Sequence, residues 1–274
     1  MNDLEEKIND YYLKFKIIYN KSNYPEWFKF YKDHNKKNYG ERGFREDGGA
    51  KKAGHNLGHY SILYTPKKNL KKPLIVIVGT NSSWFCQTGD NKMERSLKRV
   101  KELELGISET KNSYIDDGNK FGLALYSKDP YKPKVFNNLN STDLFINNTV
   151  GMNRLWLQSG STSAKVKSAA IKKFSRESKI TNKEDRLVRD SIEYYCTVWT
   201  REIIIDLIKP KLVLLMGEYA HGLLSEKNRS RDITIKHCLH PMAYPPKTGP
   251  DKGRKVQDII YDQVKSGLEI AGLK

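Results

Sequence analysis

The spacing of apolar residues along the chain predicts three main helices. Across residues 3–19, apolar side chains recur every three or four positions, which places them on one face of a helix. This apolar face consists of Leu4, Ile8, Tyr11, Tyr12, Phe15 and Ile18. Residues 187–208 are expected to form a long helix that ends before Lys209 and Pro210, because proline cannot continue a helix. Residues 254–271 are expected to form a closing amphipathic helix.

Short apolar runs that end in polar residues predict buried β-strands between the helices. These runs are residues 74–79 (LIVIVG), 143–148 (DLFINN), 211–217 (KLVLLMG) and 233–241 (ITIKHCLHP). A short helix is expected at residues 218–224, and the glycine-rich segment 34–60 is expected to be irregular. Strands that alternate with helices indicate an α/β fold, namely a three-layer sandwich around a central, mostly parallel β-sheet.

The chain shows no repeat and no linker, so we expect one domain spanning residues 1–274. Within it, residues 71–274 form the expected core, and residues 1–70 form an N-terminal extension with helical and irregular parts. The longest apolar runs, 74–78 and 212–216, are far shorter than the roughly 20 residues of a transmembrane helix. The N-terminus is charged and has no apolar signal-peptide core. A cytoplasmic protein without membrane association is therefore expected.

An excess of basic residues indicates a polyanionic partner. The 49 Lys and Arg residues outnumber the 32 Asp and Glu residues and give a net charge of +17. Lysines that neutralise phosphates release condensed counterions, so a basic face binds nucleic acid with little regard to sequence. The alternative interpretation is that clusters such as Lys67, Lys68, Lys71 and Lys72 form a solvated surface.

Metal and cofactor signatures are weak in this sequence. The three cysteines, Cys86, Cys196 and Cys238, lack the paired spacing of a zinc site or a disulfide framework. His55 and His59 have the spacing of metal ligands on a helix, but the glycines around them disfavour that helix. We therefore expect neither a metal nor a cofactor.

Polar segments follow three of the predicted strands. They are Gly79–Ser83, Asn147–Asn148 and His240–Pro241. Ligands of parallel α/β sheets bind at the carboxyl ends of the strands. The predicted fold therefore brings these three segments to one edge of the sheet.

In this order, the three segments resemble the motifs of the uracil-DNA glycosylase superfamily, especially its single-strand-selective and mismatch-specific branches. Gly79-Thr80-Asn81 keeps the Gly and Asn of the family's Gly-x-Asn-Pro-Gly motif, and Gln87-Thr88-Gly89 matches the Gln-Thr-Gly that follows it. Phe145–Asn148 occupies the place of a strand that ends in Asn, and His240-Pro241 resembles the start of the His-Pro-Ser-Pro motif. The resemblance covers about residues 73–265.

The sequence departs from these motifs at three places. Ser82 and Ser83 replace the Pro-Gly of the first motif, which leaves that loop less rigid. Asp90-Asn91-Lys92 stands where the family has a stacking aromatic, and Met242-Ala243 replaces the final Ser-Pro. These changes affect the expected substrate more than the expected fold.

The resemblance implies a monofunctional DNA glycosylase that flips a base out of the helix, hydrolyses its bond to the sugar and leaves an abasic site. Asn81 is expected to orient the attacking water, and His240 to donate a hydrogen bond to the departing base. Asn147 is expected to read the base edge, with Asn148 as the alternative register. The other expected pocket residues are Gly79, Thr80, Ser82, Trp84, Phe85 and Gln87. Met242 and Tyr244 are expected to fill the gap left in the duplex, and Lys247 to contact DNA.

The substrate hypothesis follows from the departures. Polar groups near a flipped base suit a base with a polar substituent, such as the hydroxymethylated or glucosylated cytosine of phage DNA, and imply a role in antiviral defence. Uracil repair is the alternative substrate, and a non-catalytic nucleic-acid-binding protein on the same fold is the alternative function. No paired-carboxylate metal signature favours a nuclease. We expect DNA as the partner, no obligate protein partner, and a monomer.

Overall fold

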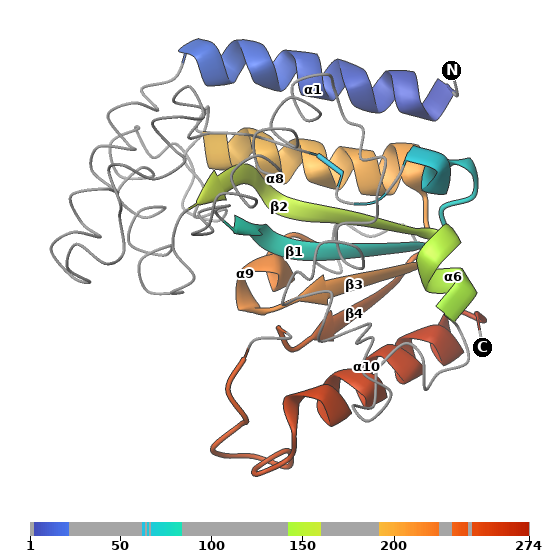
Figure 1. The fold of residues 1–274 in the computed structure, drawn as a ribbon, viewed down its shortest axis with the longest axis vertical. Helices are drawn as coiled ribbons and strands as arrows, with labels where there is room; N and C mark the ends of the chain where they lie inside the picture. The colour runs from blue at the N-terminus through green and yellow to red at the C-terminus, as the bar shows by residue number, and fades with distance from the viewer. Residues whose placement is uncertain are drawn as a thin grey trace, which may run out of the picture.

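The computed structural model describes residues 3–21, 62–63, 65, 67–83, 142–159, 192–224, 232–240 and 243–273. In these residues a four-stranded parallel sheet with the strand order β2-β1-β3-β4 forms the centre of the fold. Helices cover both faces of this sheet, as Figure 1 shows. The expected α/β class with a central parallel sheet is therefore confirmed.

The four strands begin at one edge of the sheet and end at the other. They are β1 (Ile75–Ser83), β2 (Thr149–Ser159), β3 (Leu212–Met216) and β4 (Thr234–Cys238). Ile75 pairs with Thr149 on one side and with Leu212 on the other, so β1 is a central strand. Parallel strands that are buried on both faces need continuous apolar runs, and the run before Gly79 supplies one.

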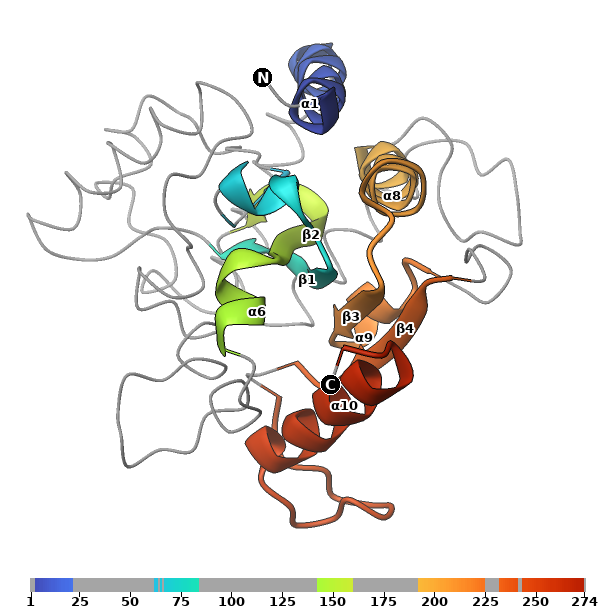
Figure 2. The same ribbon diagram turned by 90° about the vertical axis from the view of Figure 1, so that its right-hand side faces the viewer.

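Two groups of helices sandwich the sheet. On one face lie α1 (Asp3–Lys21), α8 (Ile192–Glu202) and the π-helical turn η4 (Ile203–Ile208), and on the other lies α10 (Val256–Ile270). Three short helices flank the strand ends (Figures 1 and 2). The 3-10 helix η2 (Lys67–Lys71) and the helix α6 (Thr142–Asn147) lie at the amino edge, and α9 (Glu218–His221) lies at the carboxyl edge.

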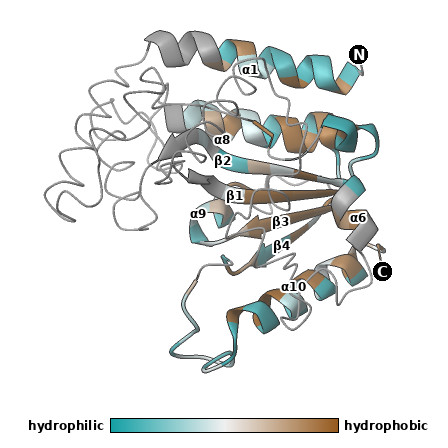
Figure 3. Ribbon diagram, viewed as in Figure 1, coloured by the Kyte–Doolittle hydropathy of each residue, from teal (hydrophilic) through white to brown (hydrophobic). Residues whose placement is uncertain are grey.

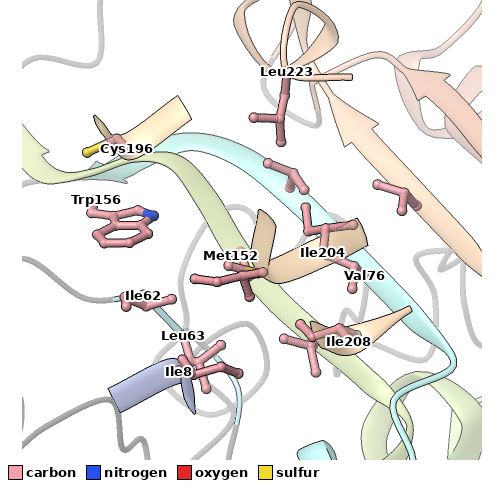
Figure 4. Packing of buried hydrophobic residues seen from close by; sticks show 14 of the residues in the cluster. Ile8, Ile62, Leu63, Val76, Met152, Trp156, Cys196, Ile204, Ile208 and Leu223 are labelled. Carbon is pink, nitrogen blue, oxygen red and sulfur yellow. The ribbon is translucent and has the colours of Figure 1, made fainter. Parts of the chain in front are cut away.

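Alternate residues of β1 and β3 enter two separate cores. Val76 and Val78 belong to the core under α1 and α8, whereas Ile75 and Ile77 belong to the core under α10. All four side chains are fully buried. Figure 3 shows the resulting apolar centre of the sheet, and Figure 4 shows the packing around Trp156 in the larger core. The period of two in a strand explains this division, because successive side chains point to opposite faces.

The N-terminal segment is part of the larger core. Ile8 and Phe15 of α1 are fully buried, and the rings of Phe15 and Trp156 lie 5.1 Å apart in an edge-to-face contact. The hydroxyl of Tyr11 donates a hydrogen bond of 3.0 Å to Glu202 of α8. Burial, together with this hydrogen bond, raises the pKa of Tyr11 to about 12. Helix α1 is thus anchored by both apolar and polar contacts.

The segment before β1 covers the outer edge of β2. Leu63 forms a bridge with Met152, and the amide of Gly151 donates to the hydroxyl of Thr65 at 3.0 Å. The amide side chain of Asn69 donates to the carbonyl of Thr149 at 2.7 Å. These contacts satisfy backbone groups of an edge strand that would otherwise pair with another chain.

Most of the predicted elements are confirmed. The helices expected at 3–19 and 254–271 are α1 and α10, and the strands expected at 74–79, 211–217 and 233–241 are β1, β3 and β4. The helix expected at 187–208 ends at Ile208 as predicted, where Lys209 adopts a left-handed φ of 50°. The helix expected at 218–224 is shorter, since α9 ends at His221. The segment 34–60 lies outside the described residues.

The strand predicted at residues 143–148 is wrong. These residues belong mostly to helix α6, and the strand follows it as β2. A short apolar run such as Leu144–Ile146 does not distinguish a helix from a strand, because it is too short to show either the 3.6-residue period of a helix or the two-residue period of a strand. The true strand was hidden by the polar residues Asn153 and Arg154 in its interior, which the fold buries. Across the helices that the structure describes, none is both long and apolar enough to cross a membrane.

The contact of α1 with the core gives a stability prediction. Phe15→Ala removes a fully buried ring, so we expect the free energy of unfolding to fall by about 3–5 kcal/mol. Leu13→Ala, on the same helix at a side chain that is 49% exposed, should cost less than about 1 kcal/mol. Urea denaturation of the full chain measures both. Equal losses in the two variants would contradict the packing of α1 on the sheet.

Candidate functional site

The strand order creates a switch point at the carboxyl edge between β1 and β3. From β1 the chain continues to β2 on one side, and from β3 it continues to β4 on the other side. In open parallel sheets ligands bind outside the carboxyl ends of the strands at such a switch point. The segments that follow β1, β3 and β4 are therefore the first place to look for a site.

The first predicted motif lies at this edge, at the end of β1. Gly79 pairs with Asn153 and Asn81 with Leu155, whereas Ser83 pairs with Ser159, so the ladder contains a bulge after Asn81. We expected the strand to give way to a loop at Gly79, but β1 continues to Ser83. Ser82 carries a backbone N–H that a proline at this position would lack, so the ladder can continue to Ser83. The side chains of Thr80, Asn81 and Ser82 lie outside the described part of the structure.

His240 lies at the same edge, two residues after the end of β4. It packs against Gly217, the residue that follows β3, and a Cβ at that glycine would lie 3.0 Å from the Cβ of His240. Gly217 has a φ of 86°, which a side chain would strain, and its amide donates to the carbonyl of Cys238 at 2.9 Å. The absence of a side chain at Gly217 thus allows the close approach of His240.

The register of the sheet relates Asn81 to His240. Val78 pairs with Leu215, and Leu215 pairs with His237, so these residues lie at one level of the sheet. Asn81 and His240 each come three residues beyond that level. Two strand spacings separate β1 from β4, which corresponds to roughly 10 Å between their backbones. The fold therefore brings these two predicted site residues to one edge with the end of β3 between them.

Asn147 lies at the opposite edge, which corrects its expected position. It is the last residue of α6, and Asn148 follows it immediately before β2. The carbonyl of Asn148 accepts hydrogen bonds from the amides of Leu74 and Ile75, at the start of β1. The Asn148 side chain donates to the carbonyl of Lys72 at 2.9 Å. The wrong strand assignment produced this error, since a residue that follows a strand and one that precedes it lie at opposite edges.

Asn153 is the polar residue of β2 that the sequence reasoning missed. It pairs with Gly79, and it is only 7% exposed. A Cβ at Gly79 would collide with the Oδ1 atom of Asn153, so the amide lies directly against that glycine. The signal in the sequence was an Asn after the apolar run that begins at Val150. Asn153 lies inside β2, level with Gly79, and is thus on the side of the sheet centre where Asn147 was expected.

Two arginines fix the segment that follows β3. Arg154 is 9% exposed, and its guanidinium donates to the hydroxyl of Thr197 at 3.2 Å and to the carbonyl of Tyr219 at 2.7 Å. It also stacks on the Tyr219 ring, 4.4 Å from the ring centroid. Arg201 donates to the carbonyl of Leu223 at 2.7 Å. Helix α9 is thereby held by side chains from β2 and α8.

A pair of histidines connects α9 to β4. The rings of His221 and His237 stack with their centroids 4.6 Å apart, and Nε2 of His221 lies 2.9 Å from the carbonyl oxygen of Cys238. Burial, and then the charge of His221, lower the pKa of His237. Burial raises the pKa of the Cys238 thiol to about 12, so this thiol stays protonated near neutral pH. These residues support the edge rather than supply a nucleophile.

The remaining predicted site residues divide into two groups. Trp84, Phe85, Gln87 and Met242 lie outside the described residues. Tyr244 and Lys247 lie in the segment that leads from β4 to α10, where Tyr244 is 90% exposed and Lys247 is also exposed. Arg254 anchors the end of that segment through ion pairs with Asp251 and Asp262.

No family model, curated protein or solved structure matches this chain. In the part of the chain that the structure describes, no three His, Cys, Asp or Glu side chains gather as metal ligands. A function can therefore be argued only from the motif order and from the geometry of the carboxyl edge.

The contact between Gly217 and His240 can be tested by substitution. Gly217→Ala strains a positive φ and pushes on His240, so we expect a loss of stability greater than about 1 kcal/mol and a changed chemical shift of the His240 ring. Gly253→Ala is the matched control, because Gly253 has a φ of 77° and nothing within 4 Å of its Cβ position. Unfolding curves and histidine NMR spectra measure the two effects. Identical behaviour of the two variants would argue against the contact.

Proposed function

We propose that this protein is a monofunctional DNA glycosylase that hydrolyses the bond between a flipped pyrimidine and its deoxyribose. The observation that carries the proposal is the placement of the first and last motif segments, Gly79–Ser83 and His240, at the same carboxyl edge of a parallel sheet, two strand spacings apart. These segments are far apart in the sequence, and they lie beside the switch point where such sheets bind ligands.

The chemistry assigns separate roles to the side chains of Asn81 and His240. Cleavage of an N-glycosidic bond builds positive charge on the sugar and negative charge on the departing base. Asn81 orients the water that attacks the sugar, and His240 donates a hydrogen bond to the base oxygen where the negative charge develops. An amide does not titrate, so Asn81 acts by positioning the water rather than by removing its proton.

Asn153 takes the role of base reader in place of Asn147. Its amide offers both a donor and an acceptor, which matches the edge of a pyrimidine. It is nearly buried against Gly79, within the same strand pair as Asn81. A buried amide in a fixed position discriminates between bases by the edge with which it can form hydrogen bonds.

The approach to DNA uses the exposed segment between β4 and α10. A base leaves the duplex only if another group fills the gap that it leaves. Tyr244 is 90% exposed, close after His240, and Lys247 adds a positive charge for the phosphate backbone. The net charge of +17 supplies attraction that does not depend on sequence.

We propose a modified pyrimidine, such as hydroxymethylated or glucosylated cytosine, as the base, with uracil as the alternative. The polar stretch Asp90-Asn91-Lys92 replaces the stacking aromatic of the resembling family. Polar side chains near the base suit a polar substituent and would leave an unmodified base with unsatisfied contacts. This substrate implies a role in defence against phage DNA.

One observation favours a second function, a non-catalytic nucleic-acid-binding protein. Asn81 lies inside the paired strand β1 rather than in a loop after it, because the ladder extends to Ser83. A backbone fixed in a ladder adjusts less easily to a substrate. The bulge after Asn81 favours catalysis instead, since β-bulges often change the direction of side chains beside active sites.

A single set of incubations separates these functions. Uracil-containing DNA, unmodified DNA and phage DNA with hydroxymethylated or glucosylated cytosine are each incubated with the protein and then treated with alkali. Strand breaks that appear only after alkali, and only in the modified DNA, support the proposal. Breaks only in uracil DNA support the alternative substrate, binding without breaks supports the second function, and breaks without alkali support a nuclease or lyase.

The roles of the three side chains give a prediction for catalysis. Asn81→Ala and His240→Ala should each lower single-turnover base release by at least about 100-fold, because each removes a group aimed at the transition state. Asn153→Ala should have a similar effect on the preferred base. Asn147→Ala is the matched control, since this exposed residue lies at the opposite edge, and its rate should not change. A large loss in the control, or normal rates in the other variants, would refute the assignment.

The exposed segment gives a prediction for duplex DNA. Tyr244→Ala combined with Met242→Ala should slow base release from duplex DNA more than from single strands, because only a duplex needs the gap filled. We expect a difference of about 10-fold or more between the two substrates. Lys247→Ala should weaken both substrates alike, because it contacts phosphate. Equal losses on duplex and single strands in the double variant would reject the gap-filling role.

A further inference from the structure

Five lysines gather at the amino edge of the sheet, opposite the candidate site. Lys68, Lys71 and Lys72 precede β1, and Lys209 and Lys211 precede β3. All five are exposed. We call this set the amino-edge lysines. The pairing of β1 with β3 brings the lysines that precede these two strands together, and the amide of Lys211 donates a hydrogen bond to the carbonyl of Leu74 at 2.9 Å. Figure 2 faces this edge of the sheet.

None of the amino-edge lysines forms an ion pair within the described residues, whereas their neighbour Lys67 pairs with Glu5. The exposed carboxylate closest in sequence, that of Asp206, forms no ion pair with any of them. The fold therefore concentrates unpaired positive charge on a small area.

We propose that the amino-edge lysines form a second nucleic-acid-binding surface, which holds the phosphate backbone of a DNA segment other than the one at the carboxyl edge. Clustered lysines repel one another at low salt, and a polyanion relieves this repulsion and releases its counterions. The inference does not depend on base excision, because it rests on charge at the other end of the strands.

Geometry separates the two surfaces. Strand β1 has nine residues, which at roughly 3.3 Å each gives about 30 Å from end to end. A short duplex bound at the carboxyl edge therefore does not reach the amino-edge lysines unless it bends around the molecule. Both surfaces can be occupied at once by two separate DNA segments or by two distant parts of one long DNA molecule.

The composition of the surface favours nucleic acid over a lipid surface. Interfacial membrane binding combines basic residues with apolar side chains that enter the lipid. Among the described residues, the exposed large apolar side chains are Leu13, Tyr244 and Ile270. Ile270 ends α10, which packs beside the start of β3, so a single exposed apolar side chain lies towards this edge (Figure 1). A mainly cationic surface of this kind matches the evenly spaced charges of a phosphate backbone better than it matches lipid.

Binding stoichiometry with a short, unmodified duplex of about one helical turn tests the proposal. Titration of the full chain should show two bound duplexes at low salt, and Lys72→Glu combined with Lys211→Glu should show one. The remaining complex should keep its affinity, and the lost one should remove its own share of the summed salt slopes, about 0.9 for each lysine that contacts a phosphate. Lys7→Glu combined with Lys14→Glu on α1 is the matched control, with the same change in net charge at exposed positions, and it should still bind two duplexes.

Several outcomes would overturn the proposal. Unchanged stoichiometry in the Lys72/Lys211 variant, or an equal loss in the control, would each do so. A single duplex that the unmodified chain binds and the variant loses would support the amino-edge lysines and count against DNA binding at the carboxyl edge. If the unmodified chain binds phosphatidylserine vesicles, and the Lys72/Lys211 variant loses this binding but still binds two duplexes, the surface is a lipid-binding surface instead. Base release from a short substrate should be unchanged in the Lys72/Lys211 variant. Failure of base excision in every variant would refute the proposed function but leave the stoichiometry test intact.

Discussion

The parallel pairing of β1 with β2 on one side and with β3 on the other is the interaction on which the rest of the structure depends. Ile75 and Ile77 enter the core under α10, and Val76 and Val78 enter the core under α1 and α8. A shift of one residue would exchange these two sets between the cores, so the register is strongly specified. The same register sets the level of every segment that emerges from the carboxyl ends of the strands.

Close packing at that edge leaves little freedom to the residues around the candidate site. Asn153 lies against Gly79, and His240 lies against Gly217, and in both cases the contact requires a position without a side chain. Arg154 then ties α9 to β2 and α8, so the end of β3 is fixed from a second direction. Such support suits a site whose chemistry is positioning, because a displacement of about 1 Å of a catalytic group is costly.

The two edges of the sheet differ in the groups that they present. Amides and a histidine meet at the carboxyl edge, whereas exposed lysines gather at the amino edge. This separation follows from the parallel arrangement, since all strands begin at one edge and end at the other. In an antiparallel sheet the same segments would be divided between both edges, and neither grouping would form.

The sequence by itself determined the fold class, the places of most elements and two of the candidate site residues. Continuous apolar runs such as Leu212–Met216 identify buried strands locally, and Asn81 and His240 follow from motifs beside such runs. Only the tertiary structure decided the identity of β2, and with it the exchange of Asn147 for Asn153. The reason is physical: the polar side chains of Asn153 and Arg154 fit inside a strand only because Gly79, Thr197 and Tyr219 receive them. Those partners come from distant segments, so no local pattern in the sequence could reveal them.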